Sequence, residues 1–167
     1  QNMIKSNFIA VKTGDVNGSV MDKLNQQSTL RTSEKTIIKI EDVNLNAGEV
    51  VVVPVYSDLT EQLAGVQWTM ELKPGLTYSG IESAAFEMND ENTGIIEKDG
   101  KQYITISSHQ LNSLSTDTKK ELFYLVFKAT TNASLSSMLK FSGDVTPALA
   151  VTRSLEEKRL AFEFRTK

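Results

Sequence analysis

Short alternations of apolar and polar residues fill most of the chain, and turn residues separate them. The clearest alternation covers residues 64–72, where Val66, Trp68 and Met70 fall in one phase and polar residues fall in the other. Because successive side chains of a strand point to opposite sides, the first set is predicted to face a core and the second to face water. Pro74 ends this predicted strand, since proline cannot donate to a ladder.

The same pattern, repeated along the chain, predicts about nine strands. Asp99 and Gly100 join two of them, because this dipeptide supplies the positive φ angles of a tight hairpin turn. No segment shows a long helical period. The fold class is therefore predicted to be all-β, an antiparallel β-sandwich. The predicted strands are residues 36–40, 50–55, 64–72, 76–81, 94–96, 103–107, 122–129, 138–141 and 160–164.

One predicted strand, residues 122–129, is apolar on both of its faces. Alternate residues from Phe123 onward form one face, and Leu122, Tyr124 and Val126 form the other. A strand in the middle of a sandwich sheet needs only one apolar face. The second face is therefore predicted either to be covered by a loop or by the N-terminal residues, or to be exposed as a contact surface.

The first 35 residues differ from the rest in their pattern. Residues 21–35 are polar and show neither the helical nor the strand period, which is typical of a linker. The sandwich domain is then predicted to occupy residues 36–167. Residues 1–5 contain no apolar signal-peptide core, and we interpret the chain as a piece of a longer protein.

Charge and composition narrow the classes of function. The 167 residues include 18 basic and 21 acidic residues, a net charge of −3, and no basic excess that would indicate a nucleic-acid partner. No apolar run reaches the roughly 18 residues that a membrane-spanning helix needs. The absence of cysteine excludes disulfides, zinc–thiolate sites and cysteine nucleophiles.

Candidates for catalysis or metal binding are few. The only histidine, His109, follows Ser107 and Ser108, but the nucleophile motif Gly-x-Ser-x-Gly is absent. No histidine or glutamate spacing suits a transition metal. No catalytic residue is therefore predicted, and His109 is interpreted as a solvated loop residue. The acidic run 87–92 either holds a structural calcium or is a hydrated loop.

Four stretches, residues 48–55, 64–74, 121–129 and 146–162, follow one another in an order that resembles the bacterial cohesin domain family. The most specific is Glu121–Ala129, which is similar to the family's Leu-Phe-x-Leu-x-Phe-Lys-Ala strand. The stretch 64–74 departs from the family, which usually has an aromatic-Asp-Pro ending where this chain has Leu-Lys-Pro. The other two are 48–55, a glycine followed by valines and Val-Pro-Val, and the closing segment 146–162. The resemblance covers about residues 36–165 and implies a jelly-roll sandwich of about nine strands. An immunoglobulin- or fibronectin-type sandwich is the alternative.

The resemblance also implies a function. Cohesins are non-catalytic modules that bind protein partners of the dockerin type, which implies a secreted or cell-surface bacterial protein with several domains. The docking face is expected to use outward residues of the third, fifth and sixth strands together with the strand 122–129. Those residues are Gln67, Thr69, Glu71, Tyr103, Thr105, Leu122, Tyr124 and Val126. A polysaccharide-binding module and a structural spacer beside a catalytic or sorting domain remain as alternatives.

Residues 8–20 resemble the end of a dockerin-type repeat, so residues 1–20 are interpreted as a dockerin-like remnant. A calcium loop of this kind needs oxygen ligands at positions one, three, five and twelve, and glycine at six. Asp15, Asn17 and Ser19 fit the first three positions, but Val20 replaces the glycine and Gln26 replaces the bidentate carboxylate. The segment is expected to bind calcium weakly or not at all, and no other cofactor is expected.

Overall fold

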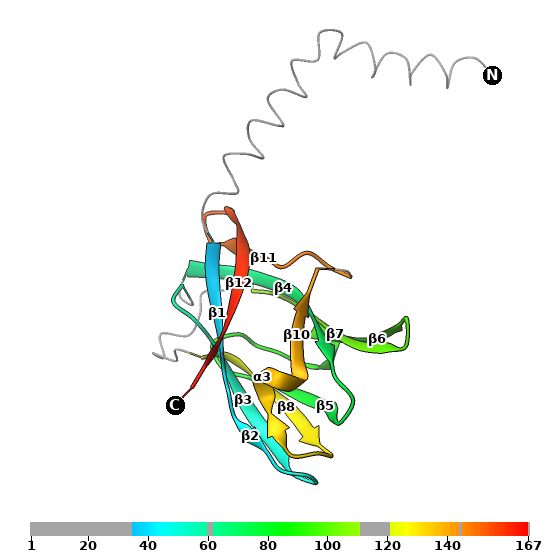
Figure 1. The fold of residues 1–167 in the computed structure, drawn as a ribbon. Coiled ribbons are helices and arrows are strands. Elements are labelled where there is room, and N and C mark those ends of the chain that lie inside the picture. The colour runs from blue at the N-terminus through cyan, green and yellow to red at the C-terminus, as the bar shows by residue number, and fades with distance from the viewer. Residues whose placement is uncertain (1–34, 60–61, 111–120, 144, 167) are drawn as a thin grey trace, which may run out of the picture. The chain divides into compact units, whose positions relative to one another are not determined.

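The computed structural model describes residues 35–59, 62–110, 121–143 and 145–166. Strands make up most of this part of the chain (Figure 1), and the 3-10 turn η2 (Asp90–Asn92) and the short helix α3 (Leu135–Met138) lie between strands. The predicted remnant at 1–20, including Asp15, Asn17 and Ser19, lies outside the described residues. The linker predicted at 21–35 lies outside them too, except for its last residue.

The strands occur where the alternation predicts them, and three further short strands were not predicted. The strands are β1 (Lys35–Glu41), β2 (Asn44–Leu45), β3 (Val50–Ser57), β4 (Leu63–Leu72), β5 (Leu76–Ser83), β6 (Thr93–Lys98), β7 (Lys101–His109), β8 (Glu121–Ala129), β9 (Ala133–Ser134), β10 (Leu139–Ser142), β11 (Leu149–Thr152) and β12 (Glu157–Arg165). The three that were not predicted are β2, β9 and β11.

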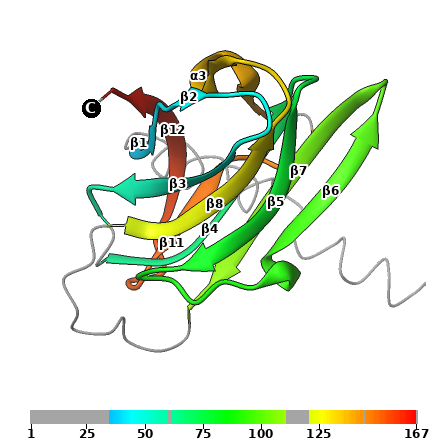
Figure 2. The same cartoon turned by 90° about the horizontal axis from the view of Figure 1, so that it is seen from below.

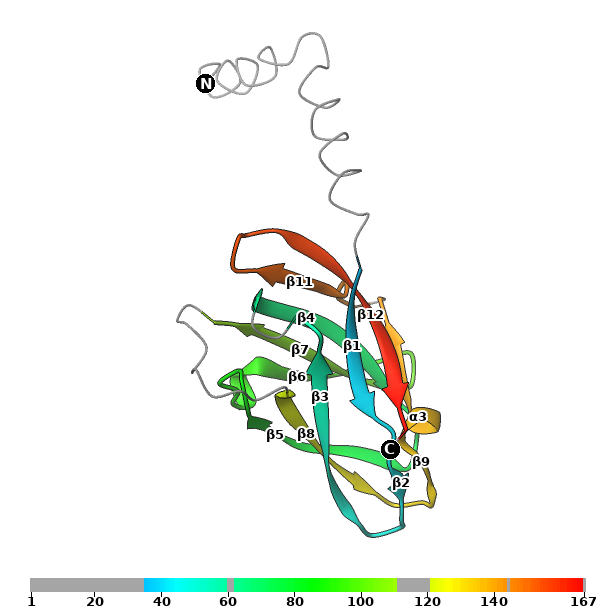
Figure 3. The same cartoon turned by 90° about the vertical axis from the view of Figure 1, so that its left-hand side faces the viewer.

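One large sheet folds over to form both layers of the sandwich. Its strand order is β5-β8-β3-β1-β12-β11-β4-β7-β6, and β10 also pairs with β4. β1 and β12 run parallel and lie side by side (Figure 3), and the other neighbours in this sheet are antiparallel. The predicted all-β jelly-roll sandwich is confirmed. Its two layers are continuous through β12 and β11.

The core lies between the β3-β8-β5 layer (Figure 2) and the β4-β7 layer. Trp68 and Met70 of β4 and Phe123 and Phe127 of β8 are all 0% exposed, as their alternation predicted. The rings of Trp68 and Phe123 stack across the two layers with centroids 5.6 Å apart. Because both layers bury their inward side chains completely here, the outward sides are held on a rigid frame.

The β6–β7 hairpin confirms the predicted turn. Asp99 and Gly100 have φ angles of 54° and 73°, so both central residues of the two-residue loop are left-handed. This conformation matches the twist of paired strands and favours Asp-Gly. The turn fixes the register of β6 on β7, with Ile96 opposite Tyr103 and Gly94 opposite Thr105.

Candidate protein-binding face

Five of the predicted docking residues lie together on the outward side of β4 and β7. The register of these two antiparallel strands places Glu71 opposite Tyr103 and Thr69 opposite Thr105, with Gln67 next along β4. β6 and β11 extend the same surface on either side. We call it the β4 face, formed by the outward residues Gly65, Gln67, Thr69, Glu71, Gly94, Ile96, Tyr103, Thr105, Ser107, His109, Leu149 and Val151.

Two of these five residues are covered, so the expectation that they point into water is wrong. Thr69 is 0% exposed, because the Thr146 hydroxyl lies 2.6 Å from the Thr69 hydroxyl and the segment before β11 covers it. Tyr103 is 4% exposed and lies between Glu71 and Ile96 in register. Thr69 and Tyr103 therefore support the face from below, and a partner cannot reach most of either side chain.

Leu122 is a second correction, because its side chain lies in the core. It was assigned to the outward face, yet Leu122 and its neighbour Phe123 are both fully buried. The pairing of β8 with β3 is irregular here: Phe123 pairs with Val55 and Glu121 pairs with Tyr56. An irregularity of this kind inserts an extra residue and breaks the strict alternation, which allows two successive side chains to point inward.

Tyr124 and Val126 point outward as predicted, but they lie on another surface. They belong to β8, which the strand order separates from β4 by β3, β1, β12 and β11. The two layers share one core, so their outward sides point away from each other. The structure therefore does not bring Tyr124 and Val126 together with Gln67, Glu71 and Thr105.

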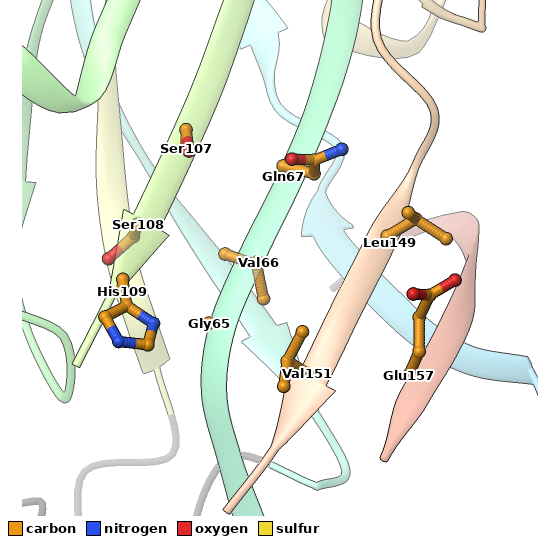
Figure 4. Close-up of a pocket in the computed structure, with 9 residues that line it drawn as sticks. All are labelled: Gly65, Val66, Gln67, Ser107, Ser108, His109, Leu149, Val151 and Glu157. Carbon is orange, nitrogen blue, oxygen red and sulfur yellow. The ribbon is translucent and has the colours of Figure 1, made fainter. Parts of the chain in front are cut away.

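A hollow of about 320 Å³ lies on the β4 face. Gly65 forms part of its floor, since glycine leaves open the space that a side chain would fill. A Cβ atom at this position would lie 2.9 Å from the Ser108 carbonyl oxygen, so β4 and β7 approach closely only because residue 65 is glycine. Figure 4 shows the remaining lining residues on β4, β7, β11 and β12, namely Val66, Gln67, Ser107, Ser108, His109, Leu149, Val151 and Glu157.

The walls of the hollow combine apolar and polar groups. Leu149 and Val151 form an apolar wall on β11, and Ser107 and His109 lie across β4 from them on β7 (Figure 4). The Gln67 amide donates a hydrogen bond to the Pro147 carbonyl oxygen at 3.2 Å, which holds the polar end of the hollow in place. An apolar recess with a polar rim suits one protruding side chain of a protein partner.

Sequence reasoning did not find the apolar wall of the hollow. Leu149 and Val151 belong to a four-residue strand, which is too short to show a clear alternation. Gly65 carried a usable signal, because a glycine inside a strand often marks a close approach of another backbone.

Other candidate chemistry is sparse in the described residues. His109 ends β7 and is exposed, so it belongs to a strand end and not to the predicted loop. Among the described residues no hydrogen bond joins His109 to a serine, and no group of three His, Asp or Glu side chains converges on a metal position. The last three residues of the acidic run form η2. Its cap uses the side-chain oxygens of Asn89 and Asn92, which accept hydrogen bonds from the Glu91 and Asn89 backbone N–H groups. In the same part of the chain, no helix is long and apolar enough to cross a bilayer.

Comparison with known proteins finds the fold in solved structures only. No protein-family model matches the chain, and no curated protein does. The sixth cohesin of scaffoldin B from Acetivibrio cellulolyticus, solved with a Cel5 dockerin mutant, is 20% identical with a TM-score of 0.53, covering 78% of this chain and 95% of that one. The described residues therefore have the fold of cohesin domains.

Two further solved structures show the same likeness. The Coh-OlpC-Doc435 complex, a type I cohesin–dockerin complex from Clostridium thermocellum, matches at a TM-score of 0.54 and 11% identity, over 81% of this chain and 96% of that one. The solution structure of CaCohA2 from Clostridium acetobutylicum matches at a TM-score of 0.53 and 17% identity. The match covers 82% of this chain and 94% of that one. At these identities the likeness concerns the fold.

Proposed function

We propose that this chain is a non-catalytic module that binds a protein partner of the dockerin type on its β4 face. The observation that carries the proposal is the hollow above Gly65, on the outward side of a cohesin-type sandwich. Two of the similar structures are complexes of a cohesin with a dockerin, which supports this class of partner. We further propose that the module belongs to a larger bacterial protein that is secreted or attached to the cell surface.

The physical basis is a rigid face with one recess. A protruding aliphatic side chain of the partner enters the hollow and contacts Leu149 and Val151, which removes apolar area from water on both sides. Ser107, His109 and Glu157 at the rim offer hydrogen bonds that fix the partner's orientation. Such a central anchor with a polar rim is the usual source of affinity in protein interfaces.

The test measures binding of the full chain to purified dockerin modules, including those of the two solved complexes, by calorimetry. Ser107→Arg places a long charged side chain across the hollow, and we expect it to weaken binding at least tenfold. Ser137→Arg is the matched control, because Ser137 is also an exposed serine but lies in α3, outside the β4 face. It should bind as the unmodified chain does.

Two results would contradict the proposal. One is the absence of binding to any dockerin module, which would favour the structural spacer. The other is equal binding by Ser107→Arg and the unmodified chain, which would place the contact elsewhere. Polysaccharide binding gains no support from the described residues, because Trp68 and Tyr103 are too deeply buried to stack on a sugar ring.

A further inference from the structure

A second surface of the sandwich carries an unexplained group of exposed apolar side chains. It lies on the outward side of β3, β8 and β5, in the layer opposite β4. Val50 and Val52 are 56% and 48% exposed and lie at the end of β3 that pairs with β8 but not with β1. We call this surface the β8 face, formed by Val50, Val52, Pro54, Thr77, Gly80, Glu82, Tyr124, Val126 and Lys128.

The register of the three strands arranges these residues in rows. Val52, Val126 and Gly80 form the middle row, and Gly80 has no side chain to cover Val126. Pro54 and Tyr124 continue the apolar area in the next row. The β8 face is therefore apolar along the whole Val52–Val126 row and at the β3 and β8 positions of the next row.

Charges of opposite sign stand at the two ends of this apolar centre. Lys128 lies in the row of Val50, on one side of Val126. Glu82 of β5 lies in the row of Tyr124, on the other side of Val126. Glu121 lies beyond Tyr124 at the same end of β8. Burial raises the pKa of the Tyr124 hydroxyl, and the nearby negative charges of Glu121 and Glu82 raise it further. Lys128, Glu82 and Glu121 take part in none of the ion pairs recorded among the described residues.

We propose that the β8 face binds the β8 face of a second copy of this chain, about a two-fold axis that crosses the strands at the Val52–Val126 row. This rotation reverses the strand direction, so the Lys128 end of one copy lies over the Tyr124 and Glu82 end of the other. A two-fold interface requires a surface that is complementary to itself. An apolar centre between a positive and a negative end has this property.

The charge pattern selects this arrangement over the other face-to-face stacking. A two-fold axis along β8, parallel to the strands, would place Lys128 over Lys128 and would place Glu82 of each copy over Pro54 of the other, away from any positive charge. Like charges in an interface are unfavourable. The axis across the strands instead places the Lys128 end of each copy over the Glu82 end of the other, so the interface contains two contacts between opposite charges. The β4 face is on the opposite side of the sandwich and takes no part, so the dimer does not depend on the function proposed above.

The first test is sedimentation of the full chain over a wide range of concentrations. We expect a reversible monomer–dimer equilibrium, and a dissociation constant at least tenfold higher for Val52→Glu. Ile95→Glu is the matched control, because Ile95 is 56% exposed but lies on the edge strand β6. It should leave the dimer unchanged. Emission of the single tryptophan reports that each variant is folded.

The second test exchanges charges between the ends. Lys128→Glu alone and Glu82→Lys alone should each weaken the dimer at least fivefold, because each creates two like-charge contacts. An equal mixture of the two variants should form heterodimers, because each altered charge then meets its opposite. The proposal is overturned if the unmodified chain sediments as a monomer at every concentration, if Val52→Glu has no effect, or if the mixture stays monomeric.

Discussion

The side chain of Trp68 illustrates how one residue contributes opposing terms to stability. Its ring stacks on Phe123 and meets Phe162 edge-on at 5.5 Å, so it joins the aromatic groups of three strands. Its indole nitrogen is buried and has no hydrogen-bond partner among the residues that the structure describes. An unpaired buried donor costs about 1–3 kcal/mol, which offsets part of what the ring gains by packing.

Two substitutions at this position separate the opposing terms. Trp68→Ala removes the whole ring, and we expect it to lower the free energy of unfolding by about 3–5 kcal/mol. Trp68→Phe removes the unpaired N–H and keeps one ring against Phe123, so we expect less than half of that loss. Urea unfolding followed by circular dichroism measures both values. Equal losses would show that the unpaired nitrogen costs nothing.

At this scale the sequence predicted the direction of side chains better than their exposure. Alternation placed Trp68 inward, and it placed Thr69 outward, where the structure also has it. It did not show that Thr146 covers Thr69, because that contact joins residues far apart in the chain. Leu122 departs even in direction, since the irregularity in β8 breaks the period on which the prediction depends.

At the scale of elements, the β6–β7 turn can be tested through backbone conformation alone. Gly100→Ala should lower the free energy of unfolding by about 1–2 kcal/mol, because an alanine there must adopt a left-handed φ. Gly80→Ala is the control, since both glycines have open space around a new Cβ atom but only Gly100 has a positive φ, of 73°. Thermal unfolding should show no loss for Gly80→Ala. A loss of the same size at Gly80 would contradict this account.

The sequence predicted the long strands and missed three short ones, β2, β9 and β11. β4, β7 and β8 each contain nine or ten residues, enough for a clear alternation. β2 and β9 contain two residues each, and their pairing is decided by the neighbouring long strands. α3 contains four residues, fewer than any periodicity can indicate.

At the scale of the whole molecule, the two surfaces are expected to act independently. A chain that uses both would assemble as two copies with two partners. Ser107→Arg should weaken partner binding at least tenfold and keep the dimer. Val52→Glu should lose the dimer and keep a complex of one chain with one partner, at half the mass. Light scattering of the purified complexes measures these masses. A variant that lost both properties while folded would show that the surfaces are coupled.

The same scale explains why the candidate site was predicted only in part. A period of two assigns each residue to one side of its own strand, but it does not say which strands share a layer. Tyr124 and Gln67 both point outward, and the strand order alone places them on opposite surfaces. The sandwich was therefore predictable from the local pattern of residues. Which residues share each of its surfaces was not predictable in this way.

The parallel pairing of β1 with β12 bears on how the sandwich responds to tension. All seven residues of β1 pair with β12, from Lys35 opposite Arg159 to Glu41 opposite Arg165. Force applied at the start of β1 and the end of β12 pulls the two strands past each other lengthwise. Their hydrogen bonds then share the load and must break together, whereas strands peeled apart from one end lose them singly. A domain joined in this way resists being pulled open when it links other parts of a chain under strain.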